Sequence, residues 1–166
     1  MLNLLDASLA NFLTPKEFPR TLIITVGNFS RADDGVGPYI ASCLRQSSRL
    51  SVIDAGYTPE NIIDDAVKLS AQRIIFIDAA DFGGACGEIR LIDGEHIPEV
   101  SLSTHSIPLP VVSRILYEDT KAKIYFIGIQ PKSVEYKEGL SGEVKSAADA
   151  LIKHVNEKFI GGSKDA

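Results

Sequence analysis

Four short apolar runs constrain the fold of this chain more than any other feature. They are nearly continuous, rich in β-branched residues and bounded by turn-forming residues. The runs are "TLIITV" at 21–26, "LSVIDA" at 50–55, "RIIFID" at 73–78 and "AKIYFIGI" at 122–129. Such runs are typical of parallel strands that are buried on both faces. The chain is therefore expected to form a mostly parallel sheet that is covered by helices.

Helical patterns separate these runs. The expected helices run from Pro38 to about Ser48, from Pro59 in "TPENIIDDAVKLSA", from Pro108 to Glu118, and from Gly142 to Phe159. Alternation of strand and helix predicts βαβ units with right-handed crossovers. The expected fold class is α/β: a single-domain three-layer αβα sandwich, phosphorylase/hydrolase-like, with a twisted sheet of about five strands. "GEIRLID" at 87–93 alternates apolar and polar residues, which favours a further strand exposed on one face; an antiparallel edge position would fit.

The length of the chain suits one domain. With 166 residues, of which 45% are hydrophobic, it is long enough for one well-buried core and short for two. Residues 1–20 are expected to form an N-terminal arm or short helix, and residues 21–160 the folded domain. The Gly-rich end, residues 161–166, is expected to be a flexible tail.

Charge and cysteine content exclude several partner classes. The net charge is −5 and no Lys/Arg cluster is present, which argues against nucleic acid or an anionic membrane as partner and suits a basic peptide better. No apolar run approaches the ~20 residues that span a bilayer, and the first residues lack a secretory signal pattern, so a cytoplasmic protein is expected. Cys43 and Cys86 are too isolated for a disulfide framework or zinc site and are expected to be buried or half-buried.

Polar residues follow the predicted strands. In open α/β sheets, ligands bind outside the carboxyl ends of the strands, so these residues are candidates for a site on one rim. They are Asn28, Asp33, Asp34, Asp54, Asp78, Asp81 and the "GIQPK" of 128–132, with His105 just before the helix at Pro108.

The residue types on this rim exclude common chemistries. Phosphate-loop patterns are absent, and the adjacent carboxylates of Asp33 and Asp34 would repel a phosphate. The G-x-S-x-G pattern of serine hydrolases is also absent, and neither cysteine stands between a strand and a helix. Asp34, Asp78 and His105 remain. Two carboxylates and an imidazole could hold a divalent transition metal with positions open for substrate, or a carboxylate could activate water.

Each of these residues also fits a structural role. Asp33 or Asp34 could simply form the turn. Asp54 and Asp78 both end strands, and nothing local distinguishes them, because a lone Asp there often caps the following segment. His105 could be a hydrogen-bonded loop histidine. The residues alone leave these alternatives open.

Five segments resemble a known family. "VGNFSRADDGVGP", "DAGYTPEN", "IFIDAADFGGACGEIRLID", "STHSIPL" and "FIGIQP" occur in the same order and spacing as in the maturation endopeptidases of nickel-iron hydrogenases. The resemblance covers about residues 21–155. The "GIQP" ending and the paired aspartates most resemble the hydrogenase 3 branch.

The resemblance implies a function and a site. The expected protein is a cytoplasmic endopeptidase that removes the C-terminal extension of the hydrogenase large-subunit precursor after nickel insertion. Nickel would be carried by the precursor's cysteines, would be bound only transiently, and would serve as the recognition element. The residues that approach it in the family fall on Asp34, Asp78 and His105. Asp34 is the expected general base, with polarisation of the carbonyl by nickel as the alternative.

Four further residues are expected to support the cleft: Asn28, Asp33, Gly35 and Asp81. An alternative function uses the same rim, namely a non-catalytic, nickel-dependent hydrogenase assembly chaperone. Precursor cleavage separates the two, whereas nickel binding does not. An unrelated ligand-binding α/β protein, in which the acids only form turns, leaves the resemblance unexplained.

Overall fold

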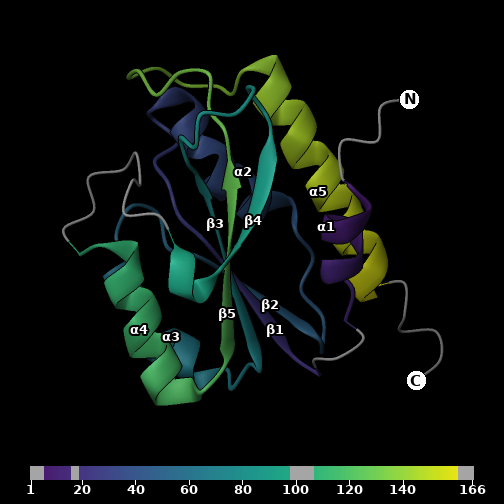
Figure 1. Cartoon of the computed structure of the whole chain (residues 1–166), viewed down its shortest axis with the longest axis vertical. Coiled ribbons are helices and arrows are strands. Elements are labelled where there is room, and N and C mark those ends of the chain that lie inside the picture. Colours follow the sequence, from purple (N-terminus) through teal and green to yellow (C-terminus); the bar gives the residue numbers. More distant parts are fainter. Residues whose placement is uncertain (1–5, 16–18, 98–106, 161–166) are drawn as a thin grey trace.

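Five strands of the described residues form a single sheet in the order β2-β1-β3-β5-β4 (Figure 1). The computed structural model describes residues 6–15, 19–97 and 107–160. The strands are β1 (Thr21–Thr25), β2 (Leu50–Asp54), β3 (Arg73–Ala79), β4 (Ile89–Asp93) and β5 (Lys123–Ile129). All neighbours pair in parallel except β4, which is antiparallel to β5 at the edge. The predicted sheet, including its additional edge strand, is confirmed.

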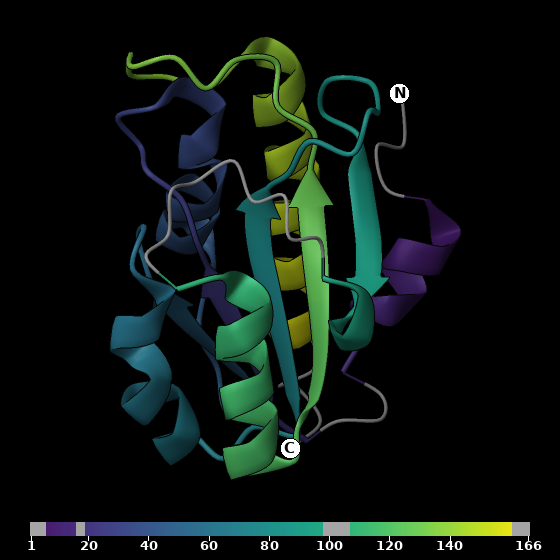
Figure 2. The same ribbon diagram turned by 60° about the vertical axis from the view of Figure 1, so that its left-hand side comes forward.

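Helices cover both faces of the sheet. The α-helices are α1 (Ala7–Phe12), α2 (Val36–Cys43), α3 (Ile63–Lys68), α4 (Leu109–Thr120) and α5 (Gly142–Ile160), and the 3-10 turns are η1 (Ala32–Gly35), η2 (Pro59–Ile62) and η3 (Gly94–His96). Successive side chains of β3 point to opposite faces. Ile75 and Ile77 pack with α1, α2 and α5, whereas Ile74 and Phe76 pack with α3 and α4. Figure 2 shows the sheet between α4 in front and α5 behind. The three-layer αβα sandwich is confirmed.

The helix expected from Pro38 to about Ser48 differs at both ends. It begins at Val36, after η1, and it ends at Cys43 because Leu44 has an extended backbone with ψ of 140°. Pro38 is the third residue of α2, a position that suits proline because the first N–H groups of a helix have no partner within it. The proline therefore marks the first turn of the helix and not its first residue.

The expected burial of the cysteines is wrong. Cys43 and Cys86 are both exposed. Cys43 ends α2, and Cys86 lies in the loop between β3 and β4, so neither belongs to the core. None of the helices in the described ranges is long and apolar enough to cross a bilayer.

The segment before β1 is packed against the domain. Asp6 caps α1 through the backbone N–H of Leu9, at 2.8 Å. Leu9 and Leu13 are only 4% and 1% exposed and belong to the same core cluster as residues of α5. The buried guanidinium of Arg73 donates to the carbonyl oxygens of Phe12 and Thr14, at 2.7 and 3.3 Å. The arm is thus joined to the first residue of β3.

The Leu13→Ala variant tests this packing. It is expected to lower the free energy of unfolding by about 3 kcal/mol, as for other fully buried leucines. Urea denaturation of the purified protein measures the change. Val111→Ala, on an exposed part of α4, is the control and is expected to change stability little. Equal effects of the two substitutions would show that the arm is not packed in solution.

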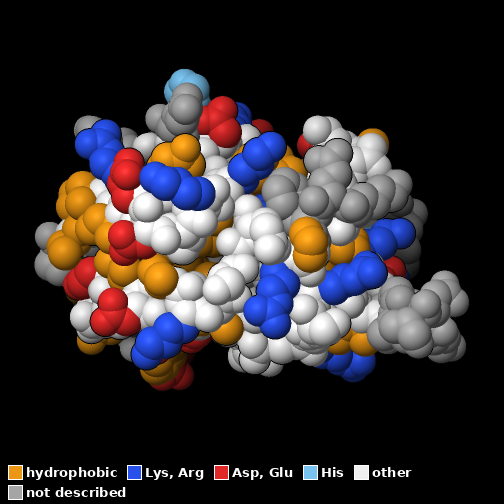
Figure 3. Space-filling model, turned by 90° about the horizontal axis from the view of Figure 1, so that it is seen from below, with side chains coloured by type: hydrophobic (Ala, Val, Ile, Leu, Met, Phe, Trp, Pro, Cys, Tyr) orange, Lys and Arg blue, Asp and Glu red, His pale blue; other side chains and the backbone are white. Residues whose placement is uncertain are grey.

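Cations mark the amino ends of the parallel strands. A cation stands at or just before the first residue of every strand that runs parallel: Arg20, Arg49, Arg73 and Lys123. Figure 3 views this end of the molecule, and Lys and Arg side chains lie across the middle of the face. Asp34, Asp54, Asp78 and Asp81 lie at the opposite, carboxyl end.

Candidate active site

Two buried carboxylates lie at the carboxyl end of neighbouring strands. Asp34 is in η1, which follows β1, and is 1% exposed, while Asp78 lies near the end of β3 and is 0% exposed. Strands β1 and β3 are paired, and η1 packs against β3. The structure therefore brings the turn that carries Asp34 against the strand that carries Asp78.

Asp78 lies on the face of the sheet that α4 covers. The alternation along β3 puts it on the same face as Ile74 and Phe76. Its partner in the β3–β5 register is Gly128, where a Cβ would lie 3.1 Å from both Ala80 Cβ and the Phe126 ring. The segment that carries His105 leads into α4, but His105 lies outside the described residues. The part of the chain that is described contains no group of three His, Cys, Asp or Glu side chains that could hold a metal.

Glycines allow η1 to fold back tightly on β1. Gly27 has φ of +147°, and a Cβ there would lie 2.0 Å from the carbonyl oxygen of Asp34. A Cβ on Gly37 would lie 2.2 Å from the carbonyl oxygen of Val26. In this compact turn, the backbone N–H of Asn28 donates to Oδ2 of Asp34 at 3.0 Å, which orients that carboxylate.

Asp33 is directed to a different part of the chain. Its carboxylate accepts hydrogen bonds from the backbone N–H groups of Lys132, Ser133 and Ser141, at 2.8, 3.2 and 2.7 Å. The Ser141 hydroxyl also donates to it, at 3.0 Å. Asp33 is 1% exposed. The two adjacent acids thus bind different segments. Asp34 accepts from Asn28, whereas Asp33 holds the segment between β5 and α5 against η1.

The other predicted rim residues are exposed or locally bonded. Oδ1 of Asp54 accepts from the backbone N–H of Gly56 within its own turn, at 2.9 Å. Oδ1 of Asp81 accepts from the backbone N–H of Gly83 and from the side chain of Gln130, both at 3.0 Å. These bonds, led by the one from Gln130, lower the pKa of Asp81 below its ordinary value. No role was predicted for Gln130, although it stands in the "GIQPK" at the end of β5.

Gly35, expected to support the cleft, is closely packed. A Cβ there would lie 2.8 Å from the Cα of Phe29, so a larger residue would push this loop outward. Asn28 accepts the N–H of Ser30 through Oδ1 at 2.9 Å and is half-buried.

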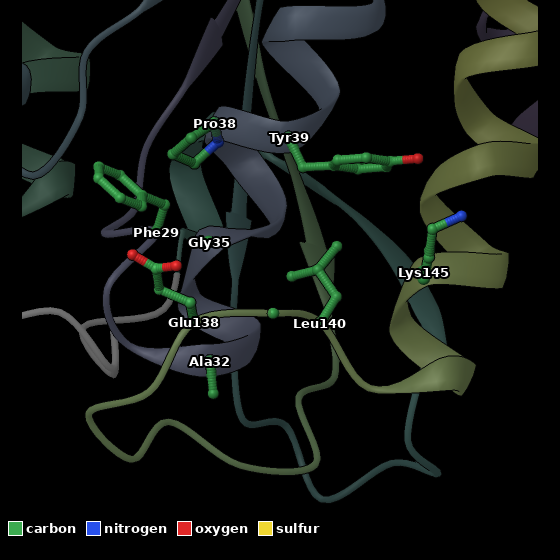
Figure 4. Close-up of a pocket in the computed structure, with 9 residues that line it drawn as sticks. Phe29, Ala32, Gly35, Pro38, Tyr39, Glu138, Leu140 and Lys145 are labelled. Atoms are coloured by element: carbon green, nitrogen blue, oxygen red, sulfur yellow. The ribbon is translucent and has the colours of Figure 1, made fainter.

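A groove of about 530 Å³ lies on the other side of η1 (Figure 4). Its walls come from the η1–α2 segment, the segment before α5 and the first turn of α5. The lining residues are Phe29, Ala32, Gly35, Pro38, Tyr39, Glu138, Gly139, Leu140 and Lys145. At its edge, Tyr39 Oη and Lys145 Nζ both donate to the carboxylate of Asp149. The hydrogen bond with Asp149 raises the pKa of Tyr39, and the one from Tyr39 lowers the pKa of Asp149.

This fold and these segments match known proteins. A family model described as hydrogenase maturation protease matches residues 38–158. The hydrogenase 3 maturation protease of Escherichia coli K12 is 34% identical over 137 residues, which is 81% of this chain and 87% of that protein.

Solved structures agree with this match. The crystal structure of the nickel-iron hydrogenase maturation protease HycI from Thermococcus kodakarensis KOD1 superposes with a TM-score of 0.82 at 27% identity, covering 93% of this chain and 99% of that one. The solution structure of the endopeptidase HycI from Escherichia coli gives 0.73 at 33% identity, covering 82% and 89%. The predicted resemblance is confirmed: the chain belongs to the hydrogenase maturation proteases, which hydrolyse peptide bonds, and is similar to the hydrogenase 3 branch.

Proposed function

We propose that this protein removes the C-terminal extension of a nickel-iron hydrogenase large-subunit precursor after nickel insertion, and that the precursor's nickel is its recognition element. The observation that carries the proposal is the pair of buried carboxylates, Asp34 and Asp78, at adjoining strand ends of a hydrogenase maturation protease. Carboxylate oxygens are ligands of divalent metal ions, and two of them from adjoining strand ends can approach one ion. A cation delivered by the substrate suits such a site.

Asp34, Asp78 and His105 are the residues proposed to contact this nickel. Carboxylate oxygen and imidazole nitrogen are both acceptable nickel ligands, and the thiolates of the precursor would supply the rest. Asp78 lies beside Gly128 of β5 and near the end of β3, at the rim where ligands of α/β sheets bind. A precursor without nickel would lack the ion that aligns its peptide bond, so cleavage before metal insertion would be prevented.

Peptide hydrolysis additionally requires an activated water. Asp34 is proposed as the general base: it takes a proton from water while the oxygen attacks the carbonyl carbon, and the C–N bond then breaks as the leaving nitrogen is protonated. The hydrogen bond from Asn28 holds Asp34 in one orientation, which general base catalysis requires. When bound, nickel could instead polarise the carbonyl.

Processing of precursor with and without nickel tests this proposal. Purified protein is mixed with the large-subunit precursor in both forms, and product mass and gel mobility are recorded. Cleavage is expected only for the nickel-loaded form. Nickel-dependent complex formation without cleavage would replace the peptidase by the chaperone alternative. Cleavage regardless of nickel would keep the peptidase but remove the nickel role of Asp34, Asp78 and His105.

His105→Ala in the same assay is expected to abolish processing, because the precursor's nickel would lose an imidazole ligand. Circular dichroism and thermal unfolding should show an intact fold. Normal processing by this variant would contradict the proposed nickel contact.

A further inference from the structure

Gln130 is a buried polar residue placed directly after β5. Its side chain and backbone are 7% exposed in total. Its backbone N–H donates to the carbonyl oxygen of Glu88 at 2.9 Å, and its own carbonyl accepts from Gly87 at 2.8 Å. These bonds continue the pairing of β5 with the segment that leads into β4. The side chain is therefore held at a fixed place at the carboxyl end of the sheet.

The side-chain amide organises the loop that follows β3. Its Oε1 accepts from the backbone N–H groups of Phe82 and Gly84, at 2.9 and 3.1 Å. Its Nε2 donates to Oδ1 of Asp81 at 3.0 Å. This pattern needs one acceptor and one donor on the same planar group. Glutamate has the acceptor without the donor at neutral pH, and methionine has similar length with neither strong group.

This loop forms the wall beside Asp78. A Cβ on Gly128, the strand partner of Asp78, would lie 3.1 Å from Cβ of Ala80 and 3.6 Å from the ring of Phe82. Residues 80–82 therefore cover the strand position next to Asp78. The guanidinium of Arg90 lies 4.2 Å from the centre of the Phe82 ring. The ring is thus held by Arg90 and, through its backbone N–H, by Gln130.

We infer that Gln130 is a positioning residue of the peptidase, whose amide group sets the conformation of residues 81–84 and thereby the wall of the site beside Asp78. The inference rests on the proposed function for its kinetic consequence. The claim that Gln130 holds the loop does not depend on the proposed function, because the hydrogen bonds of Phe82 and Gly84 can be measured without substrate. A displacement of about 1 Å in such a wall can lower a rate by roughly a hundredfold.

The test replaces the donating Nε2 of Gln130 by a second oxygen and keeps an oxygen in the place of Oε1. Gln130→Glu retains an oxygen for Phe82 and Gly84, but it places a second carboxylate against Asp81, and like charges at this separation repel. The variant is expected to lower kcat for nickel-loaded precursor roughly 10- to 100-fold, with KM nearly unchanged. Adding Asp81→Asn supplies an amide that can donate to the new carboxylate, and the double variant should recover most of the lost kcat.

Two further variants serve as controls. Asp81→Asn alone keeps an acceptor for Gln130, and its kcat is the reference with which the double variant is compared. Gln130→Met removes both functions of the amide, so it should lower kcat and should not be rescued by Asp81→Asn. Rescue of Gln130→Glu but not of Gln130→Met by Asp81→Asn would show a specific contact between the two side chains. A general loss of stability would not be corrected by Asp81→Asn in one variant only.

Amide hydrogen exchange provides a readout without precursor. Exchange at Phe82 and Gly84 should rise in Gln130→Met and return toward wild type in the Gln130→Glu, Asp81→Asn double variant. Unchanged exchange in Gln130→Met, or loss of kcat in Gln130→Glu that Asp81→Asn fails to rescue, would overturn the inference. A wild-type protein that cleaves no precursor would refute the proposed function, and the exchange results would still decide whether Gln130 holds the loop.

Discussion

The Asp34→Asn variant is expected to cleave nickel-loaded precursor roughly 10²- to 10⁴-fold more slowly than wild type, the usual contribution of a general base. The amide oxygen of Asn can still accept the N–H of Asn28, so the turn should keep its shape. An amide cannot take a proton from the attacking water. Single-turnover cleavage followed by mass spectrometry measures the effect, and the melting temperature checks the fold.

Asp54→Asn is the matched control for this substitution. Asp54 ends the neighbouring strand on the same rim, but its carboxylate accepts a hydrogen bond from the backbone N–H of Gly56 in the turn that follows. This variant should retain the wild-type rate. If Asp34→Asn were equally active, Asp34 would not be the base, and polarisation of the carbonyl by the precursor's nickel would become the better account.

The Asp33→Ala variant is expected to lower the free energy of unfolding by at least about 3 kcal/mol, since hydrogen bonds to a buried charged group each contribute roughly 1.5–3 kcal/mol. Removing the carboxylate leaves the N–H groups of Lys132, Ser133 and Ser141 without their acceptor. Chemical denaturation measures the loss. Faster amide exchange at Ser133 and Ser141 should accompany it.

Asp6→Ala is a useful comparison for Asp33→Ala. Asp6 caps α1 through Leu9 in a partly exposed setting, and losing such a cap costs about 1 kcal/mol. An effect of Asp33→Ala no larger than this would mean that the segment between β5 and α5 is held by its other contacts. A large effect would show that the first of the two adjacent acids is needed for folding.

The sheet could be predicted from the sequence because each strand is recognised by the pattern of apolar residues within its own few positions. Runs such as 73–78 are buried on both faces, so nearly every residue in them is apolar. The antiparallel edge strand was recognisable because the exposed Arg90 and Asp93 interrupt its partly buried apolar residues. The start of α2 was misjudged because proline fits several positions of a first turn, and local sequence does not choose among them.

The contacts of the candidate site depend on distant parts of the chain. The rule that strand ends converge on one rim selected Asp34 and Asp78, but it could not show that Asp33 would bond to Ser141, more than a hundred positions away. Gln130 was missed for the same reason. Its role follows from the loop after β3, and the pairing of β3 with β5 is what brings the two together. The sequence likewise shows that Leu13 is apolar, but it does not show that Leu13 packs in the same core cluster as residues of α5.

The acids beyond the carboxyl ends of the parallel strands share that end with the cations Arg90, Lys132 and Lys137, so the net charge of −5 does not describe this edge. α4 and α5 run opposite to the strands, so the positive ends of their dipoles lie near the acids and the negative ends near the amino ends of the strands. Charges of both signs at one edge partly cancel at a distance. Their separate effects are felt only within roughly the Debye length, about 8 Å at physiological ionic strength. Recognition at the face that carries Asp34 and Asp78 therefore depends on contacts made after the surfaces meet.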